Sequence, residues 1–282
     1  MRTLPTYLSA LLAGLLLAAG LTVAPAPAHA DTTILPTLPT VPEGDVPGIN
    51  NWSCRPSATH PEPVVVVHGT FGDSRHLIDV LETRIIKAGF CTFALNYGNR
   101  ATGDIPTSAR QLKAYVAKVL AATGASKVSM VGHSQGGMMP RYYIKFLGGA
   151  SKVDDLVGLS PSNHGTTNPF AVPLGLACPA CAQQAAGSAF MRNLNSGDET
   201  PGPVSYTNVA TRYDEVVTPY TSAFLHPDDA QVTNVTLQDK CPNDTSEHLR
   251  TPYDPPAIAI TLDALGHPGP ADPGYQPPCA TV

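Results

Sequence analysis

The seven residues VGHSQGG, at positions 131–137, place Ser134 between two glycines that each lie two positions away. A serine hydroxyl acts as a nucleophile only when an adjacent base can take its proton. Ser134 follows an apolar run at 127–132 and precedes a segment with helical spacing at 135–147. A sharp turn between a strand and a helix is the setting in which a serine of this pattern performs nucleophilic catalysis. We therefore predict that Ser134 is a nucleophile.

A nucleophilic serine needs a base, and four histidines follow Ser134 in the chain. When the nucleophile stands at a turn of this kind, the chain order is serine, acid and then histidine. His164 and His226 precede the last predicted strand, and His267 lies among prolines beyond the last predicted helix. His248 lies in the loop between that strand and that helix. Sequence order therefore predicts His248 as the base.

The base in turn needs a carboxylate that orients it, and this carboxylate should follow a strand at its carboxyl end. Asp214, in the stretch ATRYDEVVTP, comes soon after the apolar run 204–210, and its neighbour Glu215 is the alternative. Asp154 and Asp155 begin a predicted strand, which puts them at the opposite edge of the sheet. Asp214 is therefore the predicted acid.

Catalysis by a serine also requires two backbone N–H groups that bind the developing oxyanion. One donor should belong to Gln135, the residue after the nucleophile, and the other to the loop after the first strand. That loop has the sequence HGTFGD, and we predict Thr70 as its donor, with Phe71 as the alternative. His68, at the start of the same loop, is expected to pack beneath it as a structural residue.

The elements that must position these groups are short apolar runs that alternate with helical patterns. Strands are predicted at residues 64–68, 90–96, 127–132, 153–160, 204–210 and 232–238. Helices are predicted at residues 74–89, 107–124, 135–147 and 254–266. The second helix should be capped by Thr107 or Ser108 and end at Gly124. Strands that alternate with helices form a parallel sheet covered on both faces, so the fold class is α/β.

Residues 161–203 carry no strong helical or strand pattern. Loops of this length in a compact domain are usually functional and often form lids. We expect this lid-like insertion to border the pocket around Ser134 with uncharged residues and stiffening prolines: Pro169, Phe170, Val172, Pro173, Leu174, Leu176 and Phe190. Since no long amphipathic helix is predicted there, we expect a stiff, largely open cleft.

The first thirty residues are expected to be a signal peptide, because an apolar run of about 16 residues ends in the cleavage pattern Ala28-His29-Ala30. The run is shorter than the ~20 residues that span a membrane, so we predict a secreted, extracellular chain with no membrane span. Residues 31–63 are rich in proline and should form an extended arm on the surface. The remaining residues, 64–282, should form one catalytic domain.

Six cysteines, an even number, predict three disulfides in an exported chain, although sequence alone leaves their pairing open. We hypothesise that neighbours along the chain pair, as Cys54–Cys91, Cys178–Cys181 and Cys241–Cys279. The alternative for the stretch CPAC, a redox dithiol, is disfavoured because such a motif should open a helix that follows a strand. This stretch lies instead in a loop rich in proline, alanine and glycine.

At these residues the sequence resembles the secreted class 2 triacylglycerol lipases of actinobacteria, within the α/β-hydrolase superfamily, and also the fungal lipase B type. The motifs that carry the resemblance are VVVVHGTFGD, GHSQGG, SPSNHGTTNP, CPACAQQAAGSAFMRNLNSGDETPG, YDEVVTPYTSAFL and CPNDTSEHL. The resemblance implies Ser134 as nucleophile, Asp214 as acid, His248 as base, and Thr70 and Gln135 as oxyanion donors. It also implies hydrolysis of carboxylic esters with no cofactor and no metal.

Only the proline-rich arm precedes the first predicted strand, so the antiparallel hairpin that opens the general hydrolase plan should be absent. We therefore expect a trimmed α/β-hydrolase fold, with a six-stranded, mostly parallel sheet and helices on both faces.

The function expected from these features is that of an extracellular esterase or lipase, a monomer that makes only transient contact with a lipid interface. Charged residues make up 14% of the chain, the net charge is −5, and no basic cluster appears, which argues against nucleic acid as a partner. A cutinase-like hydrolase of polyesters is an alternative with the same chemistry. A catalytically silent secreted binding protein is an alternative of another class, because a fold alone does not prove activity.

Overall fold

The computed structural model describes residues 46–169, 177–226 and 229–279 of the 282-residue chain. The chain divides into residues 1–36 and 37–282, and the fold below is that of the second unit. The predicted signal peptide and residues 31–45 of the predicted arm lie outside the described residues. So do five of the predicted cleft residues: Phe170, Val172, Pro173, Leu174 and Leu176.

The described residues form one six-stranded sheet with the strand order β2-β1-β3-β4-β5-β6. The strands are β1 (Val64–Val67), β2 (Thr92–Leu95), β3 (Val128–His133), β4 (Val153–Leu159), β5 (Ser205–Ala210) and β6 (Val232–Thr236). All neighbouring strands run parallel. All six predicted strands are therefore present, and the α/β fold class is confirmed.

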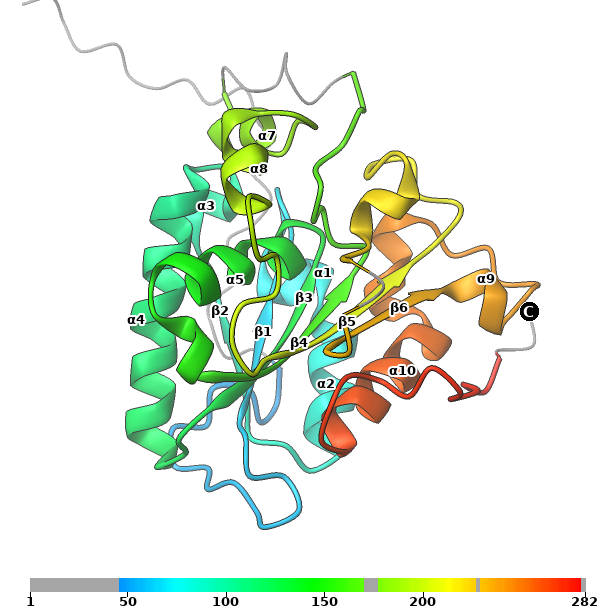
Figure 1. Cartoon of the computed structure of the whole chain (residues 1–282). Coiled ribbons are helices and arrows are strands. Elements are labelled where there is room, and N and C mark those ends of the chain that lie inside the picture. Colours follow the sequence, from blue (N-terminus) through cyan, green and yellow to red (C-terminus); the bar gives the residue numbers. More distant parts are fainter. Residues whose placement is uncertain (1–45, 170–176, 227–228, 280–282) are drawn as a thin grey trace, which may run out of the picture. The chain divides into compact units, whose positions relative to one another are not determined.

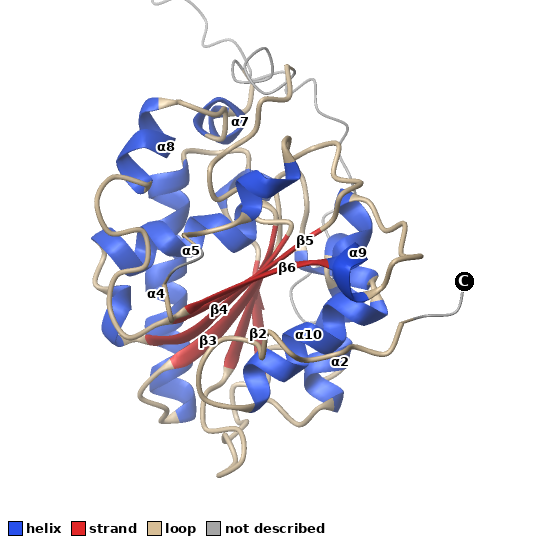
Figure 2. Cartoon of the chain, turned by 45° about the vertical axis from the view of Figure 1, so that its right-hand side comes forward, coloured by secondary structure: helices blue, strands red, loops and turns tan. Residues whose placement is uncertain are grey.

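Helices cover both faces of this sheet, as Figures 1 and 2 show. The α-helices are α1 (Ser74–Leu77), α2 (Asp79–Lys87), α3 (Gly98–Ala101), α4 (Ile105–Thr123), α5 (Gln135–Phe146), α7 (Pro179–Gln183), α8 (Ala189–Leu194), α9 (Leu237–Lys240) and α10 (Pro255–Gly266). The described residues also form three short 3-10 helices, η1 (Gly149–Ser151), η2 (Tyr220–Ala223) and η3 (His248–Tyr253).

The four valines of β1 show why both faces must be covered, because successive side chains of a strand point to opposite faces. Val65 and Val67 pack in a core with α4 and α5, whereas Val64 and Val66 pack in a second core with α2 and α10. All four valines are completely buried. A strand that is apolar at every position is typical of a parallel sheet between two helical layers.

Two predicted helices differ from their observed bounds. The helix predicted at 74–89 is interrupted at Ile78, whose backbone is not helical (φ −135°, ψ 10°) and whose side chain is fully buried. The helix predicted at 107–124 begins two residues earlier, and its cap is Asp104 rather than Thr107 or Ser108. The Asp104 carboxylate accepts a hydrogen bond from the Thr107 N–H at 2.9 Å, which satisfies a free donor of the first turn.

The described part of the proline-rich segment, residues 46–63, covers the outer edge of β2. The Asn50 side chain accepts a hydrogen bond from Ala94 N at 2.9 Å and donates one to Ala94 O at 3.0 Å. Trp52 packs against Phe93, and a disulfide joins Cys54 to Cys91 just before β2. An edge strand that is covered in this way cannot pair with another chain.

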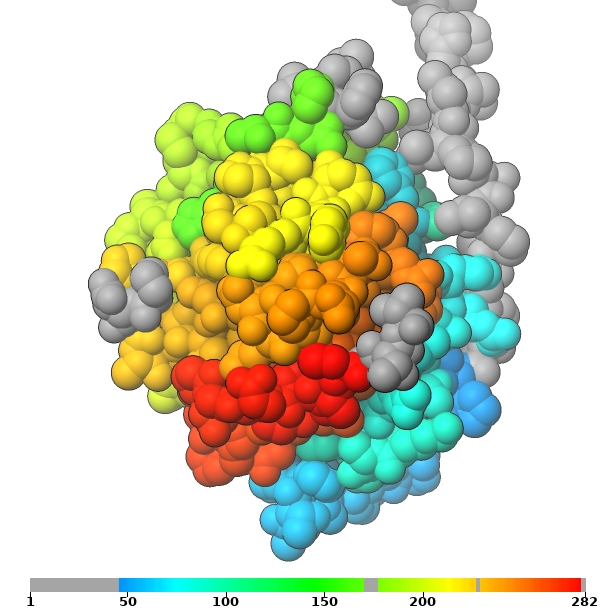
Figure 3. Space-filling model, turned by 90° about the vertical axis from the view of Figure 1, so that its right-hand side faces the viewer, coloured from blue at the N-terminus to red at the C-terminus, as the bar shows by residue number. Residues whose placement is uncertain are grey.

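Three disulfides have the pairing hypothesised from chain order, namely Cys54–Cys91, Cys178–Cys181 and Cys241–Cys279. Cys178 is the cap of the five-residue helix α7, so CPAC opens a short helix rather than lying in a loop as expected. The last bridge ties the C-terminal segment to the residues after β6. Figure 3 shows that segment, in red, lying against the orange residues of this region.

Candidate active site

Ser134 stands between the end of β3 and the start of α5 with φ +56° and ψ −123°. A residue other than glycine pays about 1–3 kcal/mol for a sparsely populated conformation of this kind, and keeps it only when its surroundings fix it. The flanking glycines supply that constraint. A Cβ on Gly132 would lie 1.9 Å from Gly136 O, and a Cβ on Gly136 would lie 2.1 Å from Val67 O. The backbone is therefore packed too closely around the serine for any side chain at these two positions.

His248 and Asp214 form a buried pair. His248 Nδ1 lies 2.8 Å from Asp214 Oδ2, and the two side chains are 2% and 1% exposed. The other oxygen of the carboxylate accepts hydrogen bonds from Val216 N at 2.9 Å and Val217 N at 2.7 Å. Two backbone donors and a histidine thus hold this carboxylate in one orientation. Glu215, the alternative acid, is exposed.

The backbone of His248 is hydrogen-bonded to His133, the residue that precedes Ser134. His133 Nε2 lies 2.9 Å from His248 O, and the two rings are 4.8 Å apart. Because a carbonyl oxygen only accepts, Nε2 of His133 must carry the proton. Burial, and after it the neighbouring His248, lowers the pKa of His133 to about 3, so His133 stays neutral near pH 7.

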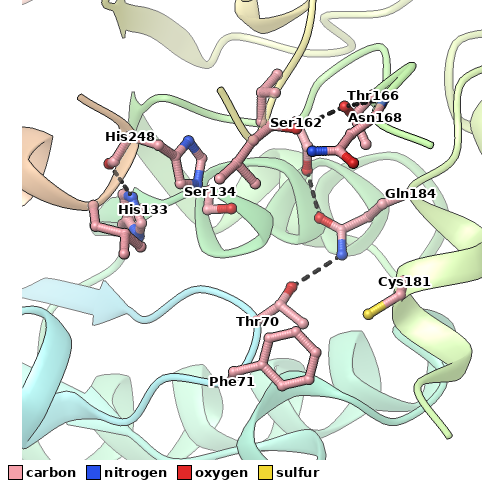
Figure 4. Close-up of a pocket in the computed structure, with 13 residues that line it drawn as sticks. Thr70, Phe71, His133, Ser134, Ser162, Thr166, Asn168, Cys181, Gln184 and His248 are labelled. Carbon is pink, nitrogen blue, oxygen red and sulfur yellow. Dashed lines mark hydrogen bonds between the residues drawn. The ribbon is translucent and has the colours of Figure 1, made fainter. Parts of the chain in front are cut away.

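A pocket of about 260 Å³ opens beside Ser134, and Figure 4 shows the ring of His248 next to the serine. Its lining combines polar groups near the serine with apolar side chains. The lining residues are Thr70, Phe71, His133, Ser134, Ser162, Thr166, Asn168, Cys181, Gln184, Val216, Val217, His248 and Leu249. The pocket therefore brings together the predicted nucleophile, the predicted base and the predicted loop donor.

The side chains of Thr70 and Gln135 meet at one side of the pocket. Thr70 Oγ1 donates to Gln135 Oε1 at 2.6 Å, and Gln184 Nε2 donates to Thr70 Oγ1 at 3.0 Å. Gln184 in turn accepts from Ser162 Oγ at 2.8 Å, as Figure 4 shows. Gln135 is the first residue of α5, so its N–H has no partner within the helix. This corner can present N–H groups to an oxyanion formed beside Ser134.

His68 lies under the loop that carries Thr70, as expected. Its ring stacks on Tyr97 with the ring centroids 4.5 Å apart, and its Nδ1 lies 2.9 Å from Gly69 O. The Tyr97 hydroxyl donates to the carbonyl of His68 at 2.8 Å. Burial lowers the pKa of His68 to about 4, so this side chain supports the loop as a neutral group.

The family model that describes class 2 lipases matches residues 61–258. This span contains Ser134, Asp214 and His248. The chain belongs to the class 2 lipase family.

Two curated proteins are similar to part of the chain. They are a triacylglycerol lipase of Pseudarthrobacter phenanthrenivorans and one of Burkholderia plantarii, each 38% identical over 86 residues. Those residues are 28% of this chain, and they span about a quarter of each relative, 27% and 24%.

Among solved structures, Aspergillus fumigatus lipase B is similar with a TM-score of 0.70 and 26% identity, over 79% of this chain and 56% of that one. A Bacillus licheniformis lipase in a propeptide form has a TM-score of 0.55 and 17% identity, over 77% of this chain and 53% of that one. The second likeness shows the α/β-hydrolase fold alone.

The described part of the 161–203 insertion contributes five residues to the pocket: Ser162, Thr166, Asn168, Cys181 and Gln184. Thr166 Oγ1 donates to Val216 O at 2.6 Å, and Asn168 Nδ2 donates to Glu215 O at 3.0 Å. The insertion is thus hydrogen-bonded to the loop that carries Asp214.

Phe190 was expected in the cleft, and that prediction is wrong. It lies on α8 in the main core and stacks on Tyr142 of α5 with the ring centroids 5.8 Å apart. The apolar face of α8 covers α5 instead of the pocket, because that face would otherwise be exposed to water.

His133, Ser162 and Gln184 are among the pocket residues that were missed from the sequence. His133 stands inside the GHSQGG motif, but only the fold reveals its contact with His248. Gln184 follows the CPAC stretch by three residues, in a segment without periodicity, so no local pattern signalled its role.

Neither a membrane span nor a metal site is found in the part of the chain that the structure describes. No helix there is long and apolar enough to cross a bilayer. No three side chains of His, Cys, Asp or Glu are grouped there so that they could hold a metal ion.

Proposed function

We propose that this lipase-family chain is an extracellular serine hydrolase that cleaves carboxylic esters of the acylglycerol type. The observation that carries the proposal is the buried 2.8 Å contact between His248 and Asp214, beside a pocket that His248 lines together with Ser134 at its strained turn. A residue pair of this kind, next to a serine at a strand-to-helix turn, is what nucleophilic acyl transfer requires.

In the proposed mechanism, Ser134 Oγ attacks the ester carbonyl while His248 Nε2 takes its proton. Asp214 accepts from His248 Nδ1–H, which keeps Nε2 unprotonated and stabilises the imidazolium that forms. The N–H groups of Thr70 and Gln135 bind the oxyanion. His248 then protonates the leaving alcohol, and an acyl-enzyme remains.

The second half of the reaction uses the same groups. His248 takes a proton from water, whose oxygen attacks the acyl-enzyme, and then returns that proton to Ser134 as the acid leaves. Every proton transfer passes through side chains of the chain itself, so the proposed chemistry needs neither metal nor cofactor.

The substrate class follows from the division of the pocket. Thr70, Ser162 and Gln184 form a polar corner that suits the ester group, whereas Val216, Val217 and Leu249 offer apolar surface for a chain. Each methylene buried there would contribute about 0.8 kcal/mol. Leu249 and Val216 are 54% and 38% exposed, so the apolar wall continues out of the pocket, towards an acyl chain or a lipid surface.

Export of the chain is part of the proposal. Three disulfides are typical of proteins that fold in an oxidising compartment. We propose that the predicted signal peptide is removed after Ala30 and that the mature chain acts outside the cell as a monomer. Amino-terminal sequencing and light scattering of the secreted protein test these two points.

The activity is tested with p-nitrophenyl esters of increasing chain length, a short triglyceride and a polyester film, each with Ser134→Ala as the control. We expect hydrolysis of dissolved short and medium esters that is absent in the variant. Turnover of the film alone would favour the cutinase-like alternative, and no turnover of any ester would favour the binding protein. A sharp rise in rate at the solubility limit of the triglyceride would contradict a stiff, open cleft.

A further inference from the structure

The helix α3, Gly98–Ala101, is a single left-handed turn. Gly98, Asn99, Arg100 and Ala101 have φ values of +59°, +50°, +60° and +58°. L-residues disfavour this region because their Cβ approaches the following carbonyl oxygen, and they visit it singly rather than in a run. Three of these four residues carry a Cβ. Such a costly turn persists only where its surroundings fix it, which makes its contacts of interest.

Arg100 is hydrogen-bonded to both backbone groups of Phe71, which lies in the loop HGTFGD after β1. Phe71 N–H donates to Arg100 O at 2.8 Å, and the Arg100 guanidinium donates to Phe71 O through Nε at 3.0 Å and also through Nη2. Phe71 itself is left-handed, with φ +64°. The Phe71 N–H belongs to the peptide group that joins Phe71 to Thr70. These hydrogen bonds therefore fix the peptide plane that directly follows Thr70, the predicted donor.

The residues after the left-handed turn position Gln184, which is hydrogen-bonded to the side chain of Thr70. Thr102 O accepts from Ala180 N at 3.0 Å, and Gln183 Nε2 donates to Asp104 Oδ1 at 2.7 Å. Both contacts fix α7, and the next residue, Gln184, donates to Thr70 Oγ1. One segment, residues 98–105, thus anchors Thr70 from its backbone side and from its side-chain side.

We propose that Arg100 is a positioning residue that aims the Thr70 N–H at the oxyanion. It does not line the pocket, so it acts through Phe71 and touches no substrate. The planar guanidinium can place two N–H groups on one carbonyl oxygen, which a lysine cannot do. The inference rests on the proposed ester hydrolysis, because an oxyanion forms only if that chemistry takes place.

The test compares Arg100→Met and Arg100→Lys with Arg192→Met as the matched control. The Arg192 guanidinium also donates to a backbone carbonyl, that of Gly187, but neither residue lines the pocket. Three quantities are measured: kcat and KM on a short p-nitrophenyl ester, the inhibition constant of phenylboronic acid, and the melting temperature. Phenylboronic acid forms a tetrahedral adduct with a nucleophilic serine and so reports on the oxyanion site.

We expect Arg100→Met to lower kcat by roughly 10- to 100-fold, the effect of misplacing a group by about 1 Å, with KM changed less than about twofold. The inhibition constant of the boronic acid should rise by the same factor as kcat/KM falls, since both report tetrahedral binding. Arg100→Lys should recover part of the loss, and Arg192→Met should match the wild type in kcat and KM.

Three results would overturn the inference. They are a kcat of Arg100→Met within twofold of the wild type, a change confined to KM, or a fall in kcat without weaker binding of the boronic acid. If Arg100→Met does not fold, Arg100→Lys carries the test, and wild-type kcat in that variant counts against the inference. A wild-type protein that hydrolyses no ester would instead overturn the proposed function, and the inference with it.

Discussion

The two halves of the pocket are built in different ways. The half that carries Ser134 and Thr70 is held by backbone packing: Gly132 and Gly136 leave no room for a Cβ, and both Ser134 and Phe71 have positive φ. The half that carries Asp214 and His248 consists of the loop after β5 and the start of η3, and neither of these two residues has a positive φ. Steric constraint fixes the first half, so the second must be fixed by something else.

Long-range bonds perform that task around His248. His133 Nε2 and Thr251 Oγ1 both donate to His248 O, at 2.9 and 3.0 Å. Thr211 Oγ1 donates to Ser246 O at 2.6 Å, and the Cys241–Cys279 bridge closes the region from the C-terminal side. We call the half with Ser134 and Thr70 the nucleophile half and the half with Asp214 and His248 the base half. We infer that substitutions in the nucleophile half destabilise it by steric clash, whereas substitutions in the base half remove a hydrogen bond or a disulfide that holds it in place.

The largest expected effect comes from the buried pair itself. Removing His248 or Asp214 by substitution with alanine should lower kcat by about 10⁴-fold, because the base is lost or held in the wrong tautomer. The measurement is kcat on a short p-nitrophenyl ester. Glu215→Ala is the matched control and should stay within a few-fold of the wild type. Loss of activity in Glu215→Ala with activity kept in Asp214→Ala would make the acid assignment wrong.

The second effect is expected from the Cys241–Cys279 disulfide, which holds the base half in place. Replacing Cys241 and Cys279 together by serine removes a bridge that spans 38 positions, worth about 4 kcal/mol in the chain-entropy model. The double variant should melt at a lower temperature and lose activity, since the loop of His248 is released. Replacing Cys178 and Cys181, only 3 positions apart, should cost about 2 kcal/mol. Unchanged melting of the first double variant would contradict a structural role for its bridge.

The third effect is the steric clash expected when a side chain is added in the nucleophile half. Gly132→Ala would place its Cβ against Gly136 O, and we expect a cost of about 3 kcal/mol in the free energy of unfolding. The melting temperature should fall by roughly 6–12 °C. Gly266→Ala is the control, because a Cβ there meets no atom within 4 Å. Equal melting temperatures of the two variants would contradict the idea that close backbone packing fixes this half.

The smallest effect concerns pH and the base half. Burial, and then the adjacent Asp244, raise the pKa of Asp254 from 3.8 to about 7. A carboxyl whose folded pKa is raised stabilises the fold fully below its unfolded pKa, and this stability is lost as the pH rises through about 7. Asp244→Asn should reduce that loss, with a melting temperature about 2–4 °C higher at pH 8 and little change at pH 4. A gain of equal size at both pH values would rule out this origin.

The same contrast explains what the sequence could predict. The six strands and Ser134 follow from local patterns, since a run such as VVVV or GHSQGG carries its own structural requirement. Asp214 and His248 have no such local pattern, and they were selected through the order of the strands and through the resemblance to class 2 lipases.

The supporting residues could not be predicted. The left-handed turn at Arg100 contains one glycine and one asparagine, which tolerate positive φ, but arginine and alanine give no such signal. Gln184 acts because α7 docks on residues 102–105, and its neighbours in sequence do not reveal that contact. The break at Ile78 depends likewise on the core that surrounds it.

We propose that Ser134 is a nucleophile activated by the His248–Asp214 pair. This role is tested by labelling the purified protein with a fluorophosphonate and locating the adduct by peptide mass spectrometry. We predict one adduct, on Ser134, that forms much more slowly in His248→Ala and is absent in Ser134→Ala. An unlabelled wild-type protein, or an adduct that persists in Ser134→Ala, would contradict the account.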